Sequence, residues 1–74
     1  MIKRKQIESS ILNSIGYDSE SEILEIELKK PKQVRQYYNF SKDTWKEFED
    51  TDSKGLYFLK YIKDQYDELR FAKR

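Results

Sequence analysis

The chain has 74 residues, enough for one small domain, and it contains neither cysteine nor histidine. Their absence excludes disulfides, thiolate metal sites and the usual general base near neutral pH, so no enzyme activity is expected. The formal net charge is only +1, so no strong overall field attracts nucleic acid. Apolar and aromatic side chains must therefore hold the fold, and neither a metal nor a cofactor is expected.

The outer parts of the chain differ in pattern from its middle. Residues 1–8 have no clear hydrophobic period and are predicted to form a flexible N-terminal arm. Residues 9–70 are predicted to form a single domain, and residues 71–74 a C-terminal tail. No apolar run approaches the roughly 20 residues of a membrane span, and no hydrophobic signal core follows the basic N-terminus. A cytoplasmic protein without a membrane partner is expected.

Three stretches are predicted to form an antiparallel sheet: residues 10–18, 22–30 and 33–40. The middle stretch is the clearest, because leucine and isoleucine alternate with Glu25 and Glu27. Paired carboxylates of this kind can serve hydrolysis, but nothing in the sequence shields or polarises them. Glu25 and Glu27 are therefore interpreted as the solvent-exposed side of an amphipathic strand.

Two helices are predicted after the strands. Ser41 is a natural N-cap for a short helix, and Phe40 and Trp45 have the spacing of a hydrophobic staple. Ser53 is a second candidate N-cap, for a longer helix that extends to residue 71. Its predicted core stripe consists of Leu56, Leu59, Ile62, Tyr66 and Leu69. The order β-β-β-α-α predicts the α+β class, with a small three-stranded antiparallel sheet followed by two helices.

Gly55 stands in the first turn of the second predicted helix, where glycine disfavours the helix by about 0.8–1 kcal/mol relative to alanine. Two explanations remain open. The favoured explanation is close packing, in which a side chain at this position would collide with the sheet or an aromatic ring. The other is anion binding by the bare amides of the helix start together with Lys54.

Aromatic residues interleave with basic residues in two segments, a pattern typical of single-stranded RNA binding. The alternative is that Tyr37 and Tyr38 are core or half-buried residues of a strand. The predicted RNA- or anion-binding residues are Arg35, Tyr37, Ser53, Lys54, Gly55, Tyr57, Lys60 and Tyr61.

Four short motifs together resemble the KTSC domain over roughly residues 7–66. They are the serine pair at positions 9 and 10, IGYD at 15–18, a central Y-x-Y and an S-K-G-x-Y/F-F helix start. The third motif departs from the family, because Arg35, Gln36 and Tyr37 stand where relatives have two tyrosines around one residue. Members of this family occur at the C-terminus of some lysyl-tRNA synthetases and as stand-alone bacterial or phage proteins.

The resemblance implies a binding module without enzyme activity, and its synthetase context makes RNA or tRNA the expected partner. The alternative is a protein-interaction module of phage or prophage origin that acts on a host protein. The sequence leaves the oligomeric state open.

Overall fold

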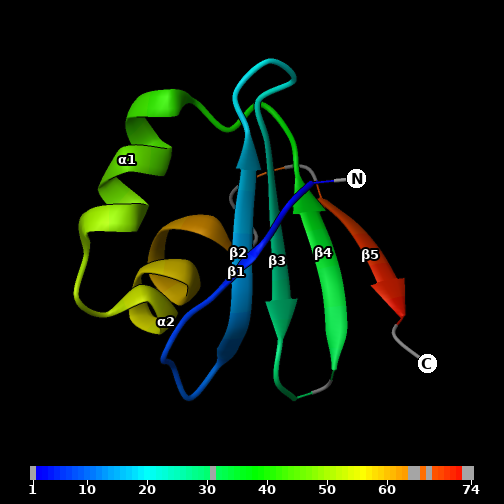
Figure 1. Cartoon of the computed structure of the whole chain (residues 1–74), viewed down its shortest axis with the longest axis vertical. Coiled ribbons are helices and arrows are strands. Elements are labelled where there is room, and N and C mark those ends of the chain that lie inside the picture. The colour runs from blue at the N-terminus through cyan, green and yellow to red at the C-terminus, as the bar shows by residue number, and fades with distance from the viewer. Residues whose placement is uncertain (1, 31, 64–65, 67, 73–74) are drawn as a thin grey trace.

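The computed structural model describes residues 2–30, 32–63, 66 and 68–72. Within these residues, five strands form one antiparallel sheet in chain order, as Figure 1 shows. The elements are β1 (Lys5–Gln6), β2 (Leu12–Asp18), β3 (Ile23–Leu28), β4 (Gln33–Tyr37), α1 (Lys42–Asp50), α2 (Lys54–Tyr57), the π-helical turn η1 (Phe58–Ile62) and β5 (Glu68–Ala72). The predicted α+β class is confirmed, but the sheet is larger than the three strands predicted.

Both additional strands lie near the ends of the chain. β1 falls within the predicted N-terminal arm and pairs with β2, with Lys5 opposite Ile15 and Gln6 opposite Ser14. β5 lies where the second helix was predicted to continue, and it pairs with β4 along the whole of that strand. The prediction of a helix to residue 71 is therefore wrong. The edge of β4 supplies backbone partners that a local hydrophobic pattern cannot reveal.

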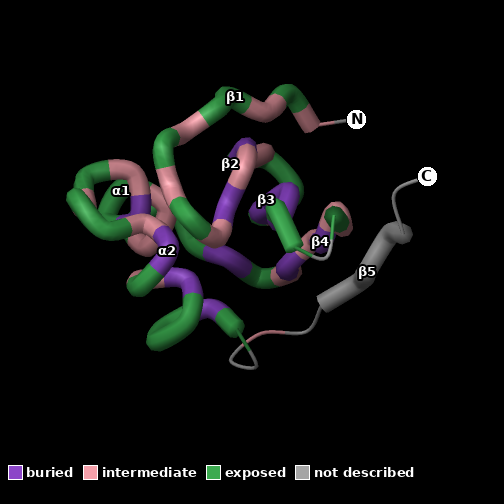
Figure 2. Tube along the Cα trace, turned by 90° about the horizontal axis from the view of Figure 1, so that it is seen from below, coloured by how far each residue is buried: buried purple, intermediate pink, exposed green. Residues whose placement is uncertain are grey.

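The core lies between the sheet and the helices. Paired residues of neighbouring strands share a face, so Ile15 and Ile26 both point toward the helices and are fully buried. A β-bulge between Leu12 and Ser14 shifts the register of β2, which allows Leu12 and Ile15 to enter the same core despite their odd spacing. Figure 2 shows the buried segments concentrated in the central strands and in α2, with the edge strand β1 on the far side of β2 from α2.

The first helix begins as predicted. The Ser41 side chain accepts a hydrogen bond from the Thr44 amide, and Phe40 is fully buried beneath that cap. Over the described ranges, no helix combines the length and apolar character that a bilayer crossing requires.

The predicted core stripe of the second helix is only partly correct. Ile62 is buried as predicted, and Tyr66 packs its ring against Phe40 at 5.0 Å. Leu56 and Leu59, however, are 57% and 43% exposed. The inward face instead consists of Gly55, Phe58 and Ile62. The predicted stripe also included Leu69, whose side chain lies outside the described part of the structure.

Candidate functional site

The serine pair and the glycine of the S-K-G motif meet in space. Ser9 Oγ accepts hydrogen bonds from the backbone amides of Ile11 and Leu12, each at 3.1 Å. A Cβ added to Gly55 would lie 3.0 Å from that Oγ and 3.2 Å from Ile11 Cδ1. The close approach of α2 to Ser9 and Ile11 therefore supports the packing explanation for Gly55.

The other two residues of the S-K-G motif have local contacts. Ser53 occupies the N-cap position as predicted, and its carbonyl oxygen accepts from the Tyr57 amide, but the predicted capping hydrogen bond of its side chain is absent. Its backbone, at φ −116° and ψ 75°, lies outside the extended region that N-cap residues usually adopt. Lys54 Nζ donates to the Thr51 carbonyl oxygen at 3.1 Å. A hollow of about 260 Å³ lies at this junction, with Asp52, Lys54 and Leu56 in its lining.

Each residue of the IGYD motif after Ile15 makes a close contact or hydrogen bond within the fold. A Cβ on Gly16 would overlap the carbonyl oxygen of Lys3, because the N-terminal segment crosses the sheet at this point. The Tyr17 hydroxyl donates to the Phe40 carbonyl oxygen. Asp18 accepts hydrogen bonds from the Ser21 hydroxyl and the Glu20 amide in the β2–β3 turn, and these bonds lower the pKa of the Asp18 carboxyl.

The sheet face opposite the helices carries a buried polar layer. Glu25 and Glu27 are 3% and 4% exposed, so the prediction that they face solvent is wrong. Arg4 forms an ion pair with Glu25, and its Nε donates to Ser14 Oγ at 3.0 Å. Gln36 Nε2 donates to the other oxygen of Glu25 at 2.8 Å. The N-terminal segment covers this face, and strand alternation alone cannot reveal such a cover.

Glu27 has a separate set of partners within the same layer. Its Oε1 accepts hydrogen bonds from Asn13 Nδ2 at 2.8 Å and from Ser14 Oγ at 3.1 Å. These contacts satisfy the buried carboxylate, and they give it a structural role. No group of three or more potential metal-ligating acids occurs in the part of the chain that the structure describes.

A second cavity, here called the aromatic cleft, lies between the N-terminal segment, β2 and α1. Its volume is about 300 Å³, and it is lined by Lys3, Arg4, Lys5, Ile15, Gly16, Tyr17, Trp45 and Glu49. The rings of Tyr17 and Trp45 stack with their centroids 5.2 Å apart and an interplanar angle of 14°. The lining thus combines an aromatic stack with one carboxylate and three basic residues, of which Arg4 has its guanidinium bound to Glu25 and Ser14.

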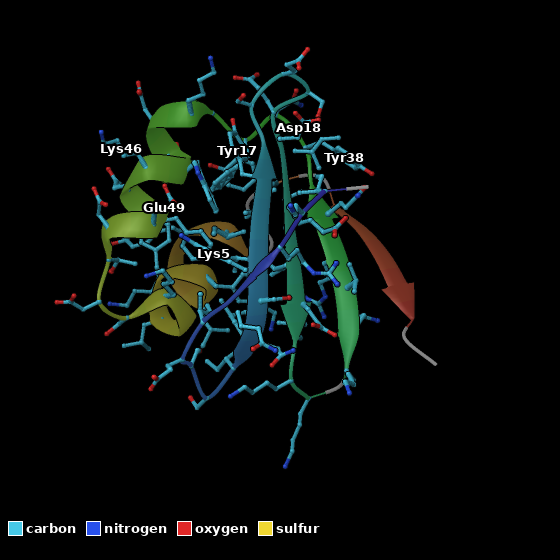
Figure 3. The ribbon with its side chains drawn as sticks, viewed as in Figure 1. Lys5, Tyr17, Asp18, Tyr38, Lys46 and Glu49 are labelled. Atoms are coloured by element: carbon cyan, nitrogen blue, oxygen red, sulfur yellow. The ribbon has the colours of Figure 1, made fainter. Side chains whose placement is uncertain are left out.

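One ion pair crosses the aromatic cleft. Lys5 Nζ lies 2.9 Å from Glu49 Oε2, and both side chains are partly exposed. Figure 3 shows that Lys5 on β1 points toward Glu49 on α1. Tyr17 lies on the neighbouring strand, and Lys46 lies on the outer side of α1. Because the pair is accessible to water, it contributes little to stability and can exchange partners readily.

The predicted RNA-binding residues do not form one continuous surface. Tyr37 is fully buried with its ring edge-to-face against Phe58 at 5.9 Å, so it cannot stack on a base. Arg35 is 8% exposed, and its Nε donates to Gln33 Oε1. Gly55 is also buried. These three residues are core or inner-face positions.

The rest of the predicted set lies along α2 and η1. Lys60 is exposed and Tyr61 is 58% exposed, and the Tyr61 ring lies 4.9 Å from the half-buried ring of Tyr57. The Tyr57 hydroxyl donates to Glu47 Oε1 at 2.7 Å. Burial, and to a smaller extent this hydrogen bond, raises the pKa of Tyr57 to about 12.

The sequence patterns missed the residues of the aromatic cleft. Lys3 and Lys5 fell in the predicted flexible arm, and Tyr17 and Trp45 were interpreted only as strand and staple residues. Their meeting depends on the crossing of the N-terminal segment over Gly16. That glycine within a strand was the one available signal, because glycine there often marks a close backbone approach.

The fold and these sites define a small α+β domain in which helices cover one sheet face and an N-terminal segment crosses the other. The KTSC domain family model matches residues 8–66, and the chain belongs to this family. The crystal structure of a KTSC domain protein from Yersinia pestis superposes with a TM-score of 0.89 at 28% identity, covering 96% of this chain and 99% of that one. No curated protein matches the chain.

Proposed function

We propose that this KTSC domain is a non-enzymatic module that binds single-stranded RNA in the aromatic cleft. The observation that carries the proposal is the stacked pair of Tyr17 and Trp45 in a cavity that the exposed residues Lys3 and Lys5 also line. Aromatic rings provide stacking surfaces for bases, and lysine and arginine attract the phosphates. This location replaces the surface around Tyr37 that the sequence suggested.

The size and charge of the aromatic cleft fit a short contact with RNA. A cavity of about 300 Å³ is at the lower end of the range for small-molecule sites, so it suits one base rather than a long strand. Stacking of one base on an aromatic ring contributes about 1–3 kcal/mol. A phosphate can take the place of Glu49 beside Lys5, because that ion pair is partly exposed.

Trp45 is the only tryptophan of the chain, so its fluorescence reports directly on the aromatic cleft. The experiment titrates the protein with single-stranded RNA and with tRNA at two salt concentrations. We expect saturable quenching of Trp45 at low salt and weaker binding at high salt, because phosphate contacts release counterions. Absence of saturable binding at low salt would refute the proposal.

A pair of double variants tests the location of the site. Replacement of Lys3 and Lys5 by glutamine removes two charges from the aromatic cleft, and we expect it to weaken RNA binding at least tenfold. Replacement of Lys29 and Lys30 by glutamine removes the same charge from exposed residues outside the cleft lining and serves as the control. An equal loss in both double variants would show general electrostatic attraction and exclude the cleft as the site.

A further inference from the structure

The outer face of α2 and η1 carries an exposed apolar patch. Leu56 and Leu59, three residues apart on one side of the segment, are 57% and 43% exposed and form this patch. Tyr61, 58% exposed, lies on another side of the segment beside Tyr57, and these three are the exposed large hydrophobic residues in the described part of the chain. None of them lines the aromatic cleft. Large apolar side chains gathered on one short segment of a small domain are typical of a surface that contacts another molecule.

The phase of the helix explains why these leucines point outward. Gly55 packs against Ser9 and Ile11, which fixes the glycine side of the helix as the inner side. Phe58 and Ile62 follow Gly55 by three and seven residues, which returns them to the same side of the helix, and both are buried. The leucines therefore lie on the outer side as a direct consequence of the packing at Gly55.

We propose that this patch is where two copies of the domain associate, with their α2–η1 segments antiparallel about a two-fold axis. An axis that passes midway along the segment, between Tyr57 and Phe58, places Leu56 opposite Leu59 of the second copy. The same axis places Asp52 opposite Lys63 of the second copy, and both residues are exposed. Each contact occurs twice, as an isologous interface requires.

The charges of the segment favour a second copy as the occupant. The acidic Asp52 precedes the helix, and Lys60 and Lys63 lie at its far end, all three exposed. An antiparallel arrangement therefore brings opposite charges together at both ends of the patch. A parallel arrangement would place the lysines of the two copies side by side, which like-charge repulsion disfavours.

The size of the segment sets the strength of the association. At about 1.5 Å per residue, Lys54–Ile62 spans roughly 13 Å, which is short for a protein interface. Interfaces of this extent belong to the weak, transient class, so the dissociation constant is expected in the micromolar to millimolar range. The protein is therefore expected as a monomer in dilute solution and as a dimer when concentrated.

Sedimentation velocity on the full chain, from about 10 µM to about 1 mM, tests this proposal. We expect a reversible monomer–dimer equilibrium without larger species. Replacement of Leu56 and Leu59 by serine should weaken the dimer at least tenfold, and the fold should persist because both side chains are exposed. A wild-type chain that stays monomeric at all concentrations, or that forms open-ended larger assemblies, would overturn the proposal.

Charge reversal tests the register. Asp52→Lys and Lys63→Glu should each weaken the dimer several-fold, and the double variant should restore it, because the reversed pair is again complementary. Lys30→Glu changes the charge at an exposed position outside the patch and should leave the dimer unchanged. Failure of the double variant to recover would exclude this arrangement. RNA quenching of Trp45 should be the same in all of these variants, since none of the changed residues lines the aromatic cleft.

Discussion

Gly16→Ala directly tests the role of the N-terminal segment. The new Cβ would overlap the carbonyl oxygen of Lys3, so the segment must leave the sheet or the strand must deform. Release of the segment breaks the short β1–β2 pairing and the ion pair between Arg4 and Glu25. The variant can always relieve the collision by this release, so its destabilisation cannot exceed what the segment contributes.

The magnitude follows from those contacts. Loss of one partner of a buried ion pair costs about 3–5 kcal/mol, but release of the segment also returns water to Glu25 and reduces this cost. The few backbone hydrogen bonds of β1 add about 1 kcal/mol each. Alanine reduces the conformational entropy of the unfolded chain relative to glycine, and this offsets about 0.4–1 kcal/mol of the lost stability. We expect a net loss of about 2–3 kcal/mol, which lowers Tm by roughly 10–20 °C.

Urea unfolding of four chains provides the assay: wild type, Gly16→Ala, a chain without residues 1–6, and the truncated chain with Gly16→Ala. The truncated chain keeps every residue of the hydrophobic core, which begins at Leu12. In the truncated chain Gly16→Ala should be neutral or slightly stabilising, because the carbonyl oxygen of Lys3 is gone. An equal loss of stability in both backgrounds would refute the crossing of the segment over Gly16 as its cause.

The remaining predictions concern three local contacts. Gly55→Ala should destabilise by about 1 kcal/mol, because crowding of Ser9 Oγ outweighs the better helix propensity; Ser9→Ala should remove most of that loss in a urea double-mutant cycle. The folded pKa of Tyr57 is about 12 against an ordinary 10.0, so stability should fall as pH rises through this interval, and Tyr57→Phe should make that fall smaller in pH-dependent denaturation, with the raised pKa of Tyr17 accounting for part of what is left. The folded pKa of Asp18 is lowered, so Asp18→Asn should be less stable than wild type at neutral pH; thermal melts should show the difference closing as pH falls through that pKa.

Local patterns predicted the elements whose signals are contained within a few residues. Alternation identified β3, since Leu24, Ile26 and Leu28 point to one side and are buried there. The cap at Ser41 was also predicted correctly, because its hydrogen bond reaches only to Thr44. These features depend on neighbours along the chain, so the sequence displays them directly.

Long-range contacts decided the features that were missed. β5 depends on the free edge of β4, and the burial of Glu25 depends on a cover supplied by Arg4 from the N-terminal segment. The aromatic cleft combines Tyr17, Trp45 and Lys5 from three elements. None of these contacts leaves a periodic signal, because each partner comes from a distant part of the chain.

The sequence by itself determined the α+β class, the antiparallel order of the central strands and membership of a family through short motifs. Only the tertiary structure decided which side of the second helix faces inward. Two apolar stripes compete there, and the pattern alone favours the one through Leu56 and Leu59. The close approach of Gly55 to Ser9 and Ile11 selects the other, because a side chain on that side of the helix would crowd both residues.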